Sequence, residues 1–157
     1  MSKSVPCAGH PTHATTLEVR NHCLCLHSQR AARALARRFD RAFRPLGLTN
    51  GQFSLLMALN RPEPPTMGSV ADMLAMDRTT MTAALKPLER RGLVEVAPGK
   101  DKRSRRPVLT DAGRSLLGQA VDVWRETHAV IDARLVAAGA EGIGAGLRAL
   151  PDLIGPD

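Results

Sequence analysis

Apolar positions recur at helical spacing along most of this 157-residue chain, and they alternate with polar positions in one short region. Spacings of three and four residues predict helices over 21–44, 49–59, 66–74, 77–91, 111–134 and, weakened by glycines, 137–150. The alternating region is Leu-Val-Glu-Val at 93–96, and Pro98 and Gly99 then start a turn. A second short apolar run follows at 108–109. The pattern predicts a mainly α fold with a small β-hairpin.

The segment from Asp77 to Gly92 has the clearest helical pattern. Asp77 is a good N-cap because its carboxylate can accept hydrogen bonds from the free backbone N–H groups of the first turn. Met81, Leu85 and Leu88 form one apolar face, and Gly92 ends the helix in the C′ position. The opposite face carries small, hydroxylated and cationic residues, namely Arg78, Thr79, Thr82, Ala83 and Lys86.

Two helices joined by a tight turn at 75–77 precede the hairpin, which is the order of a helix-turn-helix whose second helix reads DNA. In the first of them, Val70, Ala71, Met73 and Leu74 are expected to face inward. Pro87 lies inside the second, where we expect a mild kink and no break. The hairpin tip at 99–106 carries five cations against one carboxylate, so it cannot be a core element. A helix-turn-helix followed by a basic hairpin predicts a winged helix.

The stretch LERRGLVEVAPGKDKRSRRPVLTDAG, from Leu88 to Gly113, resembles the MarR family of bacterial transcriptional regulators. Members of that family combine a helix ending in LExxGLV, a wing with Asp-x-Arg and a helix that starts with LTxxG. The matching positions here are Asp101, Arg103, Leu109, Thr110 and Gly113. LGLTNGQFSLLMAL, at 46–59, looks like the family's segment entering the second helix. The resemblance covers roughly residues 22 to 135 and rests on several motifs in order.

Apolar helix beyond the winged core suggests that the terminal helices pack against a second copy, as the resemblance also implies. We therefore expect a homodimer with a helical dimerisation region formed by the N- and C-terminal helices. The expected division is a flexible arm at 1–16, a first helix at 17–45 for dimerisation and a ligand cleft, a winged helix-turn-helix DNA-binding domain at 46–110, and C-terminal dimerisation helices at 111–157.

The predicted partner is double-stranded DNA with a near-palindromic operator, with helix 77–91 in the major groove and wing 99–106 in the minor groove. The planar head of Arg103 suits a narrow minor groove, and the family motif implies that Asp101 orients it. The remaining wing cations are expected to hold phosphates. The predicted DNA contacts are Arg78, Thr79, Thr80, Thr82, Lys86, Lys100, Asp101, Lys102, Arg103, Arg105 and Arg106.

Charge supports a polyanionic partner. The formal charge is +7 and the isoelectric point is about 10.3. Seven cations and one carboxylate lie in 20–44, and nine cations and three carboxylates lie in 78–106, whereas 111–157 has four cations and seven carboxylates. The chain has no apolar run long enough for a membrane span, no signal-type segment and an odd number of cysteines, so we expect a cytoplasmic protein without a membrane partner.

Enzymatic function is not expected, because the chain has no Gly-rich phosphate loop, HExxH or GxSxG motif, and no cofactor is predicted. The resemblance implies control of a regulator, usually a repressor, by a small aromatic or anionic effector. Arg30, in an arginine stripe of the first helix, is a candidate contact for such a ligand.

Two alternatives remain open for the signal. Cys23 aligns with the reactive cysteine of the hydroperoxide-sensing branch of the family, and His27 occupies the position of an activating tyrosine there. A metal-responsive regulator could instead use the N-terminal Cys/His cluster, whose candidate ligands are Cys7, His10 and His13.

Overall fold

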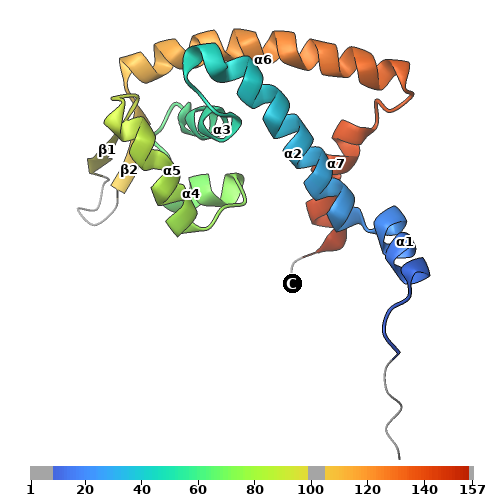
Figure 1. Cartoon of the computed structure of the whole chain (residues 1–157). Coiled ribbons are helices and arrows are strands. Elements are labelled where there is room, and N and C mark those ends of the chain that lie inside the picture. The colour runs from blue at the N-terminus through green and yellow to red at the C-terminus, as the bar shows by residue number, and fades with distance from the viewer. Residues whose placement is uncertain (1–8, 99–104, 156–157) are drawn as a thin grey trace, which may run out of the picture. The chain divides into compact units, whose positions relative to one another are not determined.

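The computed structural model describes residues 9–98 and 105–155 (Figure 1). Cys7 and four predicted wing residues, Lys100, Asp101, Lys102 and Arg103, lie outside the described residues. The chain divides into two compact units, Met1–Arg37 and Arg38–Asp157.

The first unit contains α1 (His13–His22) and the N-terminal part of α2 (Leu24–Phe43). Residues 13–16 of the expected arm belong to α1, and the first helix expected at 17–45 is interrupted at Cys23. Thr12 caps α1 by accepting a hydrogen bond from the backbone N–H of Thr15. A capped helix therefore forms near the start of the chain, where the sequence has no apolar periodicity to predict it.

Cys23 separates α1 from α2 because its backbone is extended, with φ −72° and ψ 104°. Its own N–H donates to the carbonyl of Val19, which closes the last turn of α1. Its sulfur accepts from the N–H of Leu26 at 3.4 Å and so satisfies a donor in the first turn of α2. His27 Nε2 lies 3.2 Å from the carbonyl oxygen of Asn21. The side chains of Cys23 and His27 thus bond to backbone groups beside the interruption between the two helices.

The second unit begins in α2 and continues through η1 (Arg44–Leu46), α3 (Asn50–Leu59), α4 (Met67–Met73), α5 (Arg78–Arg90), β1 (Val94–Pro98), β2 (Arg105–Leu109), α6 (Asp111–Ala137) and α7 (Ile143–Ile154). The two strands pair antiparallel, with Val94 opposite Leu109 and Pro98 opposite Arg105. Figure 1 shows α4 and α5 next to this hairpin, which is the arrangement of a winged helix. The predicted fold class is confirmed.

The predicted helix boundaries follow side-chain caps. Thr49 and Gln52 form the reciprocal capping box of α3, and Thr66 caps α4. Gly47 and Gly92 have φ angles of 63° and 67°, as expected for residues that end helices in the left-handed region. Helix α5 continues past Pro87 to Arg90, so the expectation of no break is confirmed.

The core of this unit is apolar and lies between the helices and the hairpin. Phe43 stacks on Phe53 with ring centroids 4.7 Å apart, and Phe39 stacks on Phe43 at 5.8 Å. Met81 and Leu88 of α5 are fully buried, in agreement with the sequence pattern. The burial of these side chains removes apolar surface from water and fixes α5 against the domain.

Three predictions about the second unit were wrong in detail. Met73 was expected to face inward but is 60% exposed, where its sulfur accepts a hydrogen bond from Arg61. Strand β2 begins at Arg105 and not at Val108, because pairing with β1 extends the ladder toward the tip. The last helix was predicted at 137–150 but spans Ile143–Ile154, with Pro151 inside it.

Candidate nucleic-acid interface

Helix α5 begins at a well-satisfied cap. The Asp77 carboxylate accepts from the backbone N–H of Thr80 at 2.8 Å and from the Thr80 hydroxyl. The hydrogen bond from that hydroxyl, and next the one from the backbone N–H, lower the pKa of Asp77 below its ordinary value of 3.8. Thr80 was predicted to contact DNA, but the structure turns its hydroxyl toward the cap. Its contact with DNA remains a prediction.

The solvent face of α5 carries the side chains that its sequence pattern predicted. They surround a shallow hollow of about 330 Å³ that is lined by Arg78, Thr79, Thr82, Ala83 and Lys86. All five residues are exposed, and the group has two cations and no carboxylate. The Thr82 hydroxyl donates to the carbonyl of Arg78 at 2.7 Å, within the helix. This face can therefore approach a polyanion closely.

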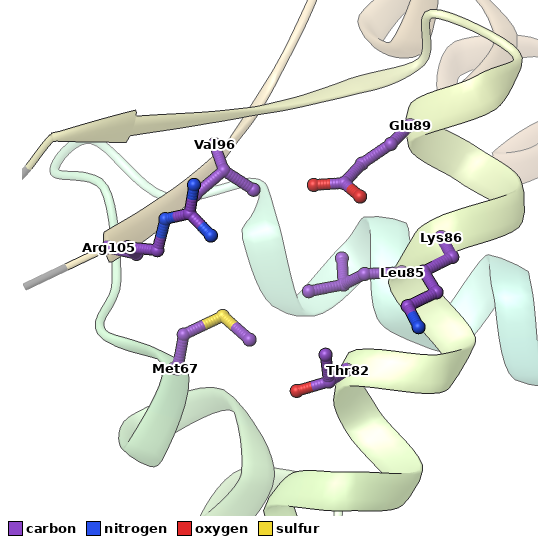
Figure 2. Close-up of a pocket in the computed structure, with 7 residues that line it drawn as sticks. All are labelled: Met67, Thr82, Leu85, Lys86, Glu89, Val96 and Arg105. Atoms are coloured by element: carbon purple, nitrogen blue, oxygen red, sulfur yellow. The ribbon is translucent and has the colours of Figure 1, made fainter.

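A second hollow lies between α5 and the hairpin, and its volume is about 350 Å³. Figure 2 shows Lys86 on the helix side and Arg105 on the strand side, while the Glu89 carboxylate points toward the Arg105 guanidinium across the hollow. Met67, Leu85 and Val96 supply apolar surface. The hollow therefore carries two cations against one carboxylate, and its net charge is positive.

The sequence pattern did not identify Met67, Glu89 and Val96 as part of this site. Met67 lies at the start of α4 and Val96 in β1, so both reach the hollow only through the packing of those elements on α5. A strand register and a helix-packing angle would have been needed to find them. Spacing along one helix, by contrast, was sufficient for Thr82 and Lys86.

Arg105 and Arg106 have different surroundings although both were predicted to hold phosphates. Arg105 is exposed on β2, whereas Arg106 is partly buried and donates from Nη1 to the carbonyl oxygen of Pro64 at 2.6 Å. That bond ties the connection between α3 and α4 to the hairpin. Arg106 thus has a structural contact, and its binding to phosphate remains a prediction.

Comparison with known proteins agrees with the winged-helix fold and the basic face of α5. A family model described as MarR family matches residues 46–104. The M. tuberculosis transcriptional regulator MosR, solved in complex with DNA, is 38% identical over 79% of this chain and 98% of its own, with a TM-score of 0.66. The chain belongs to the MarR family.

Two further relatives show how far the similarity to this MarR-family chain extends. The repressor CouR, solved on a 23-mer DNA duplex, is 26% identical, covers 94% of this chain and all of its own, and has a TM-score of 0.73. YwoH of Bacillus subtilis, an uncharacterised helix-turn-helix regulator, is 32% identical over 57% of this chain. The aligned part of the chain spans between 45% and 66% of the length of the curated relatives.

The effector candidates of this MarR-family chain lie in its first unit. Arg30, Arg33 and Arg37 share one face of α2 with two alanines and surround a shallow hollow of about 390 Å³. This places the predicted ligand contact Arg30 in a cluster of guanidinium groups. Small alanine side chains between the arginines leave room for an anion to approach.

Cys23 and His27 both lie at the junction of α1 and α2. The backbone N–H of His27 donates to the carbonyl oxygen of Cys23 at 3.1 Å, but their side chains bond elsewhere, the thiol to the N–H of Leu26 and the imidazole to the carbonyl of Asn21. Cys23 is partly exposed, and Cys25 is exposed with its sulfur accepting from Gln29 at 3.3 Å. The two thiols therefore have distinct partners.

His10 and His13 are exposed, and within residues 9–98 and 105–155 no three metal-ligating side chains gather at one place. Across the same ranges, every helix is too short or too polar to cross a membrane.

Proposed function

We propose that this MarR-family chain is a homodimeric, sequence-specific DNA-binding repressor. Helix 77–91 would enter the major groove, and wing 99–106 would enter the adjacent minor groove. The main support is the exposed face of α5, which presents Arg78 and Lys86 with small hydroxylated residues and no carboxylate. The DNA complexes of MosR and CouR support the same partner.

A dimer would explain the exposed apolar surface of the C-terminal helix. Ile143, Leu147, Leu153 and Ile154 of α7 are between 47% and 78% exposed. A second copy covering these residues would remove that surface from water. Two recognition helices related by a two-fold axis would then read half-sites about 34 Å apart, which calls for a near-palindromic operator.

We further propose that a small anionic or aromatic ligand releases the DNA. Support comes from the guanidinium cluster of Arg30, Arg33 and Arg37 in the first unit. Such a ligand can shift the protein from its DNA-binding state only if it binds the other state more tightly.

Selection of duplexes from a random-sequence pool, followed by titration of the enriched duplex, tests DNA recognition. Arg78→Ala and Arg103→Ala should weaken specific binding by about 1–3 kcal/mol if each cation contacts a base, and Lys86→Ala should lower the salt slope by about one unit if it contacts phosphate. Arg125→Gln is the matched control, because Arg125 is an exposed cation paired with Asp122 on α6.

If the wild-type protein enriches no sequence, sequence-specific binding is excluded. If it does enrich one, repeating the titration with aromatic acids, zinc and hydroperoxide distinguishes the possible signals. Release by zinc alone would favour the N-terminal histidines and Cys7 as ligands, and would contradict the proposed anionic effector.

A further inference from the structure

Arg91, the C-cap of the recognition helix, joins α5 to a distant part of the second unit. Its Nη1 donates to the carbonyl oxygen of Gly47 at 2.6 Å, and its Nη2 to that of Leu46 at 3.4 Å. These bonds connect positions 44 and 45 residues apart in the sequence. A guanidinium can make them together because its donors are held in a rigid planar fork.

The segment that Arg91 holds is the junction between α2 and α3. Helix α2 ends at Phe43, η1 follows, and Gly47 then turns the chain with a φ of 63° before Thr49 caps α3. Asp40, in the last part of α2, accepts a 2.7 Å hydrogen bond from the backbone N–H of Asn50 at the start of α3. Side-chain hydrogen bonds from α2 and from the end of α5 therefore both reach the junction.

The end of α5 is also closed by its own backbone and by a side chain at the start of α6. Gly92 donates to Glu89, and Leu93 donates to Leu88, which together close the helix end in a Schellman arrangement. The Thr110 hydroxyl then donates to the carbonyl oxygen of Gly92 at 2.6 Å. Arg91 supplies what these bonds do not, a contact with the residues that follow α2.

We propose that Arg91 is a positioning residue for the recognition helix. By binding the carbonyls of Leu46 and Gly47, it sets the position of α5 relative to the α2–α3 junction, and so the angle at which the exposed face of α5 meets a base edge. This inference rests on the proposed function, because it assigns Arg91 a role in sequence discrimination. It also provides a direct route by which a displacement of the end of α2 reaches the recognition helix.

The competing explanation is that Arg91, an exposed cation, simply binds a DNA phosphate. The two roles predict different observations. A phosphate contact adds affinity to every duplex and contributes to the salt slope. A positioning contact affects the enriched duplex far more than a shuffled one, because only base readout depends on the placement of the helix within the groove.

Arg90 offers a matched control at the neighbouring position. It is also exposed and carries the same charge, but its Nε donates to the Lys86 carbonyl within its own helix, at 3.4 Å. Arg90→Gln therefore removes one positive charge without removing the bonds to Leu46 and Gly47. Arg91→Gln removes both the charge and the bonds, and Arg91→Lys keeps the charge but loses the planar fork.

The experiment measures the affinities of the full chain and these three variants for the duplex enriched by the wild type and for a shuffled duplex of equal length, at several salt concentrations. We expect Arg91→Gln to lower the ratio of the two affinities about tenfold, the effect of one hydrogen bond from a charged group. Arg91→Lys should also lower the ratio while keeping the wild-type salt slope. Arg90→Gln should keep the wild-type ratio.

Hydrogen exchange at the amides of Gly47 and Leu48 provides a readout without DNA, and should be faster in both Arg91 variants than in Arg90→Gln. The inference is overturned if Arg91→Lys keeps the wild-type ratio and exchange rates, or if Arg91→Gln weakens both duplexes equally with a smaller salt slope. If the wild type selects no duplex, the proposed function fails, and the exchange measurement still tests the contact itself.

Discussion

A Cβ atom added to Gly113 would lie 2.0 Å from the carbonyl oxygen of Leu93. Gly113 is in the first turn of α6, where its N–H donates to the Thr110 hydroxyl at 3.0 Å. Leu93 precedes β1, and its carbonyl accepts from the backbone N–H of Thr110. The start of α6 therefore packs directly on the backbone that enters the wing, at a distance that only glycine permits.

Replacing Gly113 by alanine should destabilise the fold by about 1–3 kcal/mol or more, because backbone atoms must move apart. Thermal or urea unfolding measures the effect. Gly118→Ala is the control in the same helix, since its Cβ would meet no atom within 4 Å. That change should be neutral or stabilise the protein by up to about 1 kcal/mol through helix propensity. Equal stabilities of the two variants would contradict the close contact.

The cap of α5 should make stability depend on pH. Hydrogen bonds in the folded protein lower the pKa of Asp77, so its stabilising contribution is present above the unfolded-state pKa and is lost as the pH falls through the folded-state value. Asp77→Asn should therefore differ from wild type most at neutral pH and least below about pH 3. Urea titrations at several pH values measure this difference.

Thr80→Val tests the cause of that dependence, because the Thr80 hydroxyl makes the largest contribution to the lowered pKa of Asp77. The comparison is between the single variant Thr80→Val and the double variant that also carries Asp77→Asn. The difference in stability between these two proteins should change less with pH than the difference between wild type and Asp77→Asn. An unchanged pH dependence would assign the lowered pKa to the backbone N–H groups alone.

Leu153 should be important for assembly if α7 covers a second copy. It is 78% exposed in the single chain. Leu153→Glu should shift the protein from dimer to monomer in sedimentation experiments, and weaken the dimer by about 2 kcal/mol or more if the residue is central in the interface. The neighbouring exposed residue gives the control Asp152→Ala, which should stay dimeric. A wild-type protein that sediments as a monomer would exclude the dimer.

The redox alternative depends on Cys23 at the junction of α1 and α2. If this thiol senses oxidants, hydroperoxide should release wild-type protein from its enriched duplex, and Cys23→Ser should remain bound. Cys25→Ser, which changes the exposed thiol two residues away, should respond as wild type does. A Cys23→Ser protein that is released like the wild type would exclude this mechanism. Mobility-shift titrations with and without hydroperoxide make the comparison.

The sequence was sufficient for features that depend on neighbours along the chain. Helical periodicity predicted the buried face of α5, and the residue types Thr, Asp and Gly at defined offsets predicted its caps and those of α3, α4 and α6. The exposed cations of α5 followed from the same spacing. Local chemistry sets each of these features, so no knowledge of packing was required.

Other features depended on residues far apart in sequence. The bond from the Arg106 guanidinium to Pro64, the bonds from Arg91 to Leu46 and Gly47, and the contribution of Met67 and Val96 to the hollow beside α5 all required tertiary packing. The break at Cys23 was missed for a related reason, since its cost is offset by side-chain bonds that periodicity does not report.

By itself, the sequence determined which helices form in the winged core and which of their faces carry charge. Only the tertiary structure decided which arginines are free to meet a partner and which hold the fold together, such as Arg91 and Arg106. That choice depends on tertiary packing, because a guanidinium can donate to a carbonyl far along the chain only where the fold brings the two groups together.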